Sequence, residues 1–193
     1  MEIIDSHCHL DFDKFDHDLD KVISRAKDSG VSKILTICTK KYNLNKNINI
    51  CENNDFIFFA YGLHPLNVGK EKIGTKEILK TSKHKKMIAI GETGLDYFYS
   101  KENIASQKKS FIEHIKLSQN IRLPLIIHSR DADEDMQTIL VEEYRKKPFL
   151  AVMHCFSSGQ SLANTAIDLG FYLSMSGIIT YPKSNELREI FSR

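Results

Sequence analysis

Two histidines near the N-terminus have the spacing of paired metal ligands. His7 and His9 follow a short apolar run at residues 3–4. Residues two apart on a strand point to the same face, so both imidazoles are predicted to project inward while Cys8 points outward. Two imidazoles about 6–7 Å apart along a strand can share one metal ion. The spacing fits a hydrogen-bonded pair of histidines equally well, so it does not decide between the two by itself.

Three further residues of ligand type each follow an apolar run later in the chain. They are Glu92, His128 and His154, spaced about one strand-and-helix unit apart. A carboxylate at the end of a buried strand is costly unless it is paired or bound to metal. The carboxyl ends of barrel strands meet at one mouth, where such folds place their chemistry. One such histidine alone is typically structural, but five ligand-type residues at four strand ends predict a metal site.

The chemistry of these side chains limits the metal. Imidazole and carboxylate without a thiolate cluster suit divalent ions such as Mg, Mn or Zn, and the set does not choose among them. Five ligands exceed what one tetrahedral ion needs, so two divalent metal ions are predicted as cofactors, with Glu92 bridging them. Two ions a few ångströms apart can activate a water and stabilise the leaving oxygen of a phosphoryl displacement.

Seven apolar runs alternate with segments of helical periodicity. Runs without polar alternation are typical of parallel strands covered by helices, and they occupy residues 3–4, 34–38, 56–63, 87–90, 123–127, 150–153 and 171–175. A dinucleotide-binding sheet would need a glycine-rich turn after the first strand, whereas residues 5–9 contain no glycine. We therefore predict a TIM-type (β/α) barrel. A full barrel takes about 250 residues. Residues 1–193 are therefore expected to form a single domain with about seven of the eight strand-and-helix units, incomplete at the C-terminus. In such a barrel the first and seventh strands would have unpaired edges.

Composition restricts the function less than the ligand pattern does. The chain has 193 residues, 41% of them hydrophobic, and a formal net charge of +2, which gives no pointer to nucleic acid. Four cysteines without a C-x-x-C pair predict reduced thiols and a cytoplasmic protein. No signal-peptide pattern and no apolar run of about 18 residues is present, so no membrane association is expected. His17, His84 and His114 lie in charged helical segments and are predicted to be surface residues.

The chain resembles the TatD family of metal-dependent deoxyribonucleases, within the amidohydrolase-like barrel superfamily. The matching stretches are collinear and span most of the chain, at residues 4–11, 62–65, 90–97, 123–130, 154–157 and 172–177. The resemblance implies a nuclease that removes nucleotides from DNA ends with two divalent cations. It implies that His7 and His9 bind one ion, that His128 and His154 bind the other, and that Glu92 binds both.

The resemblance also suggests catalytic residues and substrate contacts. His64 corresponds to a histidine near the substrate phosphate and is predicted to assist catalysis beside Glu92; it fits equally well a structural residue before Pro65. The partner would be DNA. Residues 97–99 are three aromatics that could stack on bases or cover the barrel mouth. Four basic residues near strand ends could meet phosphates or belong to a lysine-rich surface: Lys40, Lys41, Arg130 and Lys183.

One family feature is missing from the sequence. The family has an aspartate at the end of its eighth strand, in a Thr-Asp-Ser-Pro-like motif, and this sequence ends at Arg193 before any such motif. One alternative is therefore a catalytically impaired remnant that still binds metal, or a chain that a second polypeptide completes. Another is a cyclic-amide hydrolase of the same superfamily. Those enzymes often bridge their metals with a modified lysine on the fourth strand, where this chain has Glu92.

Overall fold

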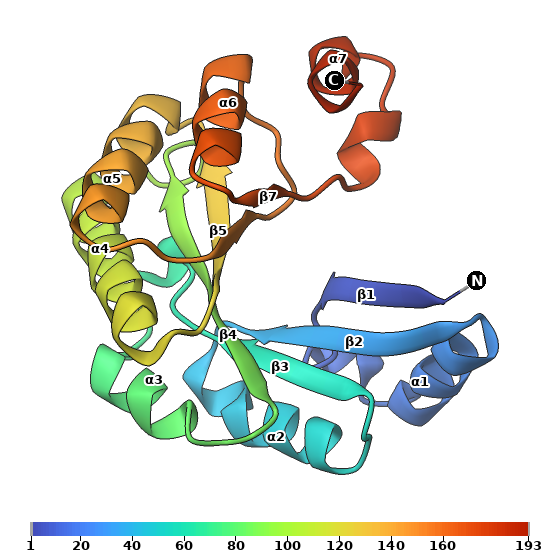
Figure 1. The fold of residues 1–193 in the computed structure, drawn as a ribbon. Helices are drawn as coiled ribbons and strands as arrows, with labels where there is room; N and C mark the ends of the chain where they lie inside the picture. The colour runs from blue at the N-terminus through green and yellow to red at the C-terminus, as the bar shows by residue number, and fades with distance from the viewer. Residues whose placement is uncertain (1, 193) are drawn as a thin grey trace.

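Seven parallel strands form one curled sheet in simple chain order. The computed structural model describes residues 2–192. Strands that are neighbours in the sheet are also consecutive in the chain, from β1 to β7, and the sheet bends into a half-barrel (Figure 1). The strands are β1 Ile3–Cys8, β2 Val31–Cys38, β3 Ile57–Tyr61, β4 Met87–Asp96, β5 Leu125–Arg130, β6 Ala151–Met153 and β7 Tyr172–Leu173. The predicted fold class, an incomplete TIM-type α/β barrel, is confirmed.

Helices follow the strands and cover the convex face of the sheet (Figure 1). They are α1 Leu19–Asp28, α2 Leu44–Glu52, α3 Thr75–Thr81, α4 Ile104–Ile121, α5 Asp133–Lys146, α6 Gln160–Asp168 and α7 Asn185–Phe191. Four short 3-10 turns join them: η1 Asp13–Phe15, η2 Lys41–Asn43, η3 Pro65–Asn67 and η4 Gly177–Thr180. Gly30 and Gly170 adopt positive φ angles of 89° and 76° just after α1 and α6, where glycine is the favoured helix stop.

The two faces of the sheet bury different side chains. Large residues such as Phe59 and Tyr61 are fully buried in the main core, which includes helix residues such as Phe111. A second, smaller cluster of Ile37, Ala60, Ala89 and Ile126 lies across the middle of β2 to β5. Alternate residues of a barrel strand face its interior. Because His128 lies two residues beyond Ile126 on β5, it is placed on the concave side, nearer the carboxyl ends of the strands.

The two outermost strands are each paired on one side only among residues 2–192. β1 and β7 lie apart at the ends of the curled sheet (Figure 1). Between them is a groove of about 430 Å³, whose lining includes His7, His154, Val152 and Tyr172. The expected unpaired edges are therefore present in the structure.

The prediction that His114 lies at the surface is wrong. Its side chain is on the buried face of α4, with 2% of the residue exposed. Its Nδ1 lies 2.7 Å from the carbonyl oxygen of Ser110, and its Nε2 accepts a hydrogen bond from the backbone N–H of Leu63 at 3.1 Å. Burial lowers the pKa of His114, so the ring is neutral. His17 is exposed, as predicted, whereas His84 is partly buried.

Two further expectations concern the state of the cysteines and the presence of membrane-spanning helices. All four cysteines are free thiols, as predicted: Cys8, Cys38, Cys51 and Cys155. No helix within the described residues has the length and apolar character needed to cross a membrane.

Candidate metal centre

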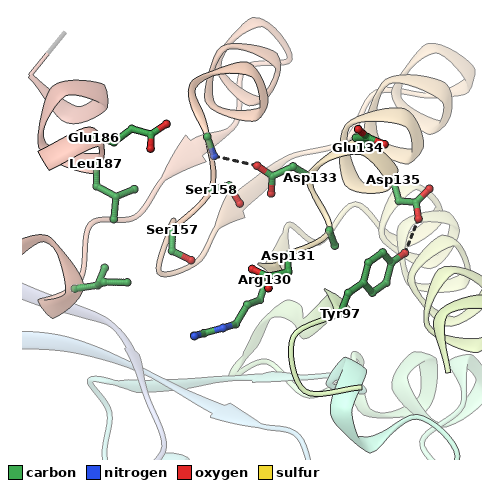
Figure 2. A pocket seen from close by; sticks show the side chains of 13 residues that line it. Tyr97, Arg130, Asp131, Asp133, Glu134, Asp135, Ser157, Ser158, Glu186 and Leu187 are labelled. Carbon is green, nitrogen blue, oxygen red and sulfur yellow. Dashed lines mark hydrogen bonds between the residues drawn. The ribbon is translucent and has the colours of Figure 1, made fainter. Parts of the chain in front are cut away.

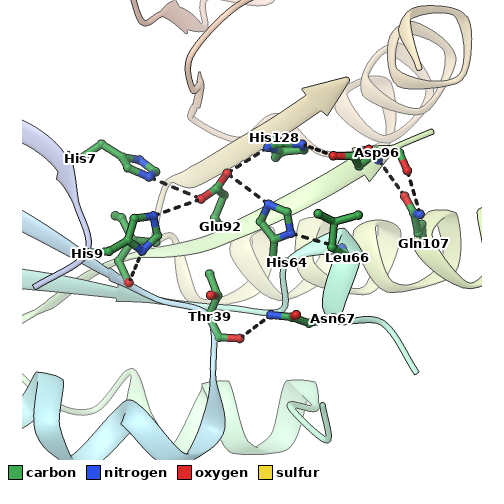
Figure 3. Close-up of polar contacts among 11 residues, drawn as sticks. His7, His9, Thr39, His64, Leu66, Asn67, Glu92, Asp96, Gln107 and His128 are labelled. Atoms are coloured by element: carbon green, nitrogen blue, oxygen red, sulfur yellow. Dashed lines mark hydrogen bonds and ion pairs between the residues drawn. The ribbon is translucent and has the colours of Figure 1, made fainter. Parts of the chain in front are cut away.

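Four strands bring the five predicted ligands to one place. His7 lies on β1, Glu92 on β4 and His128 on β5, while His9 and His154 come directly after β1 and β6. Figure 3 shows the imidazoles of His7, His9 and His128 around the carboxylate of Glu92, at the carboxyl-end side of the sheet. The convergence expected from the sequence is present, and metal binding by these residues stays a prediction.

Glu92 is the centre of this arrangement. Its Oε1 lies 3.0 Å from Nδ1 of His128 and 3.5 Å from Nε2 of His64. Its Oε2 lies 3.4 Å from Nε2 of His7 and 3.9 Å from Nε2 of His9. The residue is only 5% exposed. Burial alone would raise the pKa of Glu92, but hydrogen bonds from His128 and His64 and the nearby His7 hold that pKa well below its usual range.

One candidate ligand group consists of His64, Glu92 and His128. Their ligand atoms all lie within 4.8 Å of one another. In the metal-free protein, Nδ1 of His64 accepts a hydrogen bond from the backbone N–H of Leu66 at 3.2 Å, which leaves the proton on Nε2. To bind a cation through Nε2, His64 must move that proton to Nδ1 and lose this hydrogen bond. Nε2 of His128 lies 3.0 Å from Oδ2 of Asp96. Both rings of this His64–His128 group are therefore held by hydrogen bonds in addition to their contacts with Glu92.

The other candidate ligand group consists of His7, Glu92 and His154, again with ligand atoms within 4.8 Å. The rings of His7 and His154 are stacked, with centroids 3.4 Å apart and planes inclined by 10°. Burial, together with the neighbouring His7, lowers the pKa of His154 to about 4, so its ring is neutral at pH 7. Nε2 of His7 is buried and makes no hydrogen bond in the described structure.

The unpaired nitrogen of His7 tests whether this His7–His154 group fits a cation. A buried ring nitrogen without a partner costs free energy. A divalent cation held by neutral imidazoles and an ionised carboxylate would satisfy that nitrogen. The residues therefore fit a metal ion here, and the same ligand chemistry is present in the His64–His128 group.

These groups differ from the ligand pairing that the resemblance implies. His7 is grouped with His154 rather than with His9, and His128 is grouped with His64. His9 belongs to neither group. Its Nδ1 lies 3.0 Å from the carbonyl oxygen of Ile37. Nε2 of His64, which was expected to assist catalysis near the substrate, lies among the candidate ligand atoms, and its catalytic role stays a prediction.

A family model described as TatD related DNase matches residues 4–193. The chain belongs to the TatD-related DNase family. The resemblance drawn from the sequence motifs is therefore confirmed.

Two curated relatives illustrate the likeness within the TatD family. One is the uncharacterized metal-dependent hydrolase YcfH of Escherichia coli, 34% identical over 192 residues, which cover 98% of this chain and 72% of the relative. The other is the uncharacterized metal-dependent hydrolase YabD of Bacillus subtilis, 35% identical over 189 residues, which cover 97% of this chain and 74% of the relative.

Solved structures show the same TatD-family fold. The crystal structure of YjjV, a TatD homolog from Escherichia coli, superposes with a TM-score of 0.89 at 29% identity, covering 99% of this chain and 74% of that one. A TatD family hydrolase from Entamoeba histolytica gives a TM-score of 0.85 at 23% identity, covering 100% of this chain and 70% of that one.

Asp96 is a site residue of this TatD-family chain that the sequence reasoning did not single out. It is 1% exposed, and besides His128 it accepts a hydrogen bond at Oδ1 from the backbone N–H of Tyr99 at 2.8 Å. Its own backbone N–H donates to Oε1 of Gln107 at 2.8 Å. The signal was its spacing of four from Glu92, which on a strand gives both carboxylates the same face.

Close backbone contact between β4 and β5 sets the position of His128. Gly94 has a φ of 143°, and a Cβ atom there would lie 2.0 Å from the carbonyl oxygen of His128. A side chain at this position would therefore displace either strand. Only glycine allows β4 to approach β5 beside a candidate ligand.

Two hollows adjoin on the carboxyl-end side of the sheet. The metal pocket has a volume of about 380 Å³ and includes the candidate ligands His9, His64, Glu92, His128 and His154. A larger cavity of about 660 Å³ lies beside it and shares Arg130 with it (Figure 2). We call it the acidic cavity because its lining has five carboxylates: Asp131, Asp133, Glu134, Asp135 and Glu186.

The aromatic and basic residues predicted to contact DNA differ in their exposure and in the side chains that they contact. The hydroxyl of Tyr97 donates to Oδ2 of Asp135 at 2.7 Å, on the wall of the acidic cavity (Figure 2). Phe98 and Tyr99 are exposed, and the guanidinium of Arg130 lies 4.4 Å and 5.4 Å from their ring centroids. Lys41 is paired with Glu77, so it does not face the metal pocket as a free cation.

Proposed function

We propose that this chain is a hydrolase that cleaves phosphodiester bonds of DNA with two divalent metal ions. The observation that carries the proposal is the pair of ligand groups that share the single buried carboxylate of Glu92. The description of the matching family as a DNase, and the names of relatives as metal-dependent hydrolases, support it.

The chain's own residues would divide the work around Glu92. His7 and His154 would hold one Mg, Mn or Zn ion, and His64 and His128 the other. When bound, such ions lower the pKa of a coordinated water and neutralise charge on a phosphate. The low pKa of Glu92 keeps this carboxylate ionised near neutral pH, and the lowered pKa of His154 keeps a ring lone pair free.

A nuclease assay with chelator and one ligand variant tests the proposal. We expect purified protein to degrade a labelled DNA oligonucleotide with added Mn²⁺, and we expect EDTA and His128→Ala each to abolish degradation. His17→Ala, which alters a histidine away from the ligand groups, serves as the matched control. Degradation that survives both EDTA and His128→Ala would overturn the proposal.

A metal-binding chain with little turnover is the second candidate function. It is favoured by the groove beside His7 and His154, which leaves this ligand group open between β1 and β7. Elemental analysis of the same protein separates the two candidates. Two bound ions with turnover no faster than that of Glu92→Gln would support the second, whereas two ions with chelator-sensitive DNA degradation would exclude it.

A further inference from the structure

A small hollow next to the metal pocket combines exposed aromatic rings with lysine side chains. It has a volume of about 260 Å³, and its lining is Phe12, Asp13, Lys14, Lys40, Tyr42 and Asn43. We call it the basic hollow. It lies between the loop and 3-10 turn that follow β1 and those that follow β2. Phe12 lines both the basic hollow and the metal pocket, so the two adjoin at this residue.

The aromatic rings of the basic hollow are held open to solvent. Phe12 is 37% exposed and Tyr42 is 65% exposed. One face of Phe12 stacks on the imidazole of His9, with ring centroids 4.7 Å apart and planes inclined by 17°. The histidine therefore fixes the ring of Phe12 at the boundary between the two hollows. An exposed, oriented aromatic ring is a platform on which a base of any sequence can stack.

The two lysines of the basic hollow lie over its rings. The ammonium of Lys14 is 5.7 Å from the ring centroid of Phe12, and that of Lys40 is 5.5 Å from the ring centroid of Tyr42. Neither lysine forms an ion pair within residues 2–192, in contrast to nearby Lys41, which pairs with Glu77. Unpaired ammonium groups beside exposed rings provide the two contacts that a nucleotide needs, one for phosphate and one for base.

The charges of the two hollows beside the metal pocket favour a path for a polyanion from the metal pocket into the basic hollow. The basic hollow has two lysines against one aspartate, Asp13, in its lining. The acidic cavity has one basic residue, Arg130, against its five carboxylates. A chain of phosphates leaving the metal pocket is repelled by the acidic cavity and attracted by the basic hollow.

We propose that the basic hollow of Phe12, Lys14, Lys40 and Tyr42 is a substrate subsite for the nucleotide next to the cleaved phosphodiester. Its base stacks on the exposed rings, and its phosphate faces the two ammonium groups. The inference rests on the proposed function, because it takes the metal pocket as the place where the phosphodiester is cut.

Binding without catalysis tests the subsite. The probe is fluorescein-labelled hexathymidylate, measured by anisotropy in EDTA over a series of salt concentrations. We expect Tyr42→Leu to weaken binding by about 5-fold or more, the lower end of what loss of base stacking costs. We expect Lys14→Gln combined with Lys40→Gln to reduce the slope of log affinity against log salt by about 0.7, the contribution of one phosphate contact to a single strand.

Matched controls exclude a general effect of surface change. Tyr181→Leu removes a tyrosine of similar exposure, 63%, outside the basic hollow, and Lys21→Gln removes a lysine on α1. Both should bind hexathymidylate as the unaltered chain does, and Lys40→Arg should retain most of the salt slope that Lys40→Gln loses. Thermal unfolding of each variant checks that it is folded.

The outcomes separate the subsite from the proposed function. Binding that weakens only in the hollow variants supports the subsite, even if the protein degrades no DNA; in that case the proposed function alone fails. Equal binding by the hollow variants and the controls, or no binding of hexathymidylate by the unaltered chain, overturns the subsite. If chelator-sensitive DNA degradation is nevertheless observed, the proposed function stands without it.

Discussion

The two ligand groups share Glu92 and the same ligand types but differ in their surroundings. In the His64–His128 group, hydrogen bonds from the backbone of Leu66 and to Asp96 hold the rings even without a cation. In the His7–His154 group the rings stack on each other, and one of them has an unpaired buried nitrogen. The second group also borders the groove between β1 and β7.

This difference changes how many protons the two groups hold. Burial lowers the pKa of His128, but hydrogen bonds to Glu92 and Asp96 outweigh burial and raise the pKa above its usual value. Burial and His7 lower the pKa of His154 to about 4. Ion pairing therefore stabilises one group in the absence of metal, whereas in the other group the ring of His154 is neutral and its lone pair is free for a cation.

The largest effect on metal binding and activity is expected from substitution of Glu92, the residue that both ligand groups share. Glu92→Gln removes the anionic oxygens that both groups use, so we expect both bound ions to be lost and DNA cleavage to fall by more than about 100-fold. That exceeds the 10–100-fold cost typical of residues that only orient a ligand. Elemental analysis and the oligonucleotide assay measure the two effects. A variant that kept one ion and much of its activity would show that the groups do not depend on a shared carboxylate.

A smaller effect is expected from a change that reaches only one group. Asp96→Asn replaces the carboxylate that contacts His128, so we expect metal affinity or activity to fall by about 10–100-fold, with one ion retained. Asp135→Asn is the matched control, because that carboxylate contacts Lys108 and Tyr97 instead of a candidate ligand. Equal losses of both ions in Asp96→Asn would contradict the assignment of Asp96 to one group.

The smallest expected effect is on stability in metal-free protein, where the two groups should have opposite pH dependence. His154 titrates near 4 when folded and near 6.5 when unfolded, so the unfolded chain takes up its proton first and the free energy of unfolding falls as pH drops from 6.5 towards 4. His128 has a raised folded pKa, so its stabilisation is complete below 6.5 and is lost as pH rises through that raised value.

Urea unfolding in EDTA at a series of pH values distinguishes these two slopes. We expect His154→Gln to reduce the loss of stability at acid pH, by on the order of 1 kcal/mol or more. We expect His128→Gln to reduce the loss as pH rises. His9 and His114 also have lowered pKa values and add to the acid slope, so each variant is compared with the unaltered chain. The same change of slope in both variants would contradict the assigned proton states.

The sequence predicted the strands and their convergence well, for a simple geometric reason. Continuous apolar runs mark strands buried on both faces, and the carboxyl ends of parallel strands lie at one edge. Glu92, His128 and His154 could therefore be placed together without coordinates. His7 and His9 were expected to act as a pair through the strand period of two, but β1 ends at Cys8. His9 lies just beyond the strand, yet its Nε2 still lies 3.9 Å from Oε2 of Glu92 while its Nδ1 lies 3.0 Å from the carbonyl oxygen of Ile37. Joint metal binding by His7 and His9 stays a prediction.

Two other residues show what the sequence pattern does not contain. Asp96 lies six residues beyond the apolar run at 87–90, but β4 extends to it through a segment with two glycines and two polar residues. A strand that continues through such a segment is set by pairing with β5, which is a tertiary effect. His114 was misplaced because the charges around it on α4 do not reveal which face packs against the sheet.

The close contact between β4 and β5 at Gly94 affects which strand of the site unfolds locally more easily. β4 and β5 touch through backbone atoms beside His128, so moving the backbone of His128 away from that of Glu92 requires two paired strands to slide. His7 lies on β1, which is paired on one side only among the described residues. Amide hydrogen exchange in metal-free protein should therefore be faster along β1 than along β5, because fraying at an outer strand needs fewer broken hydrogen bonds.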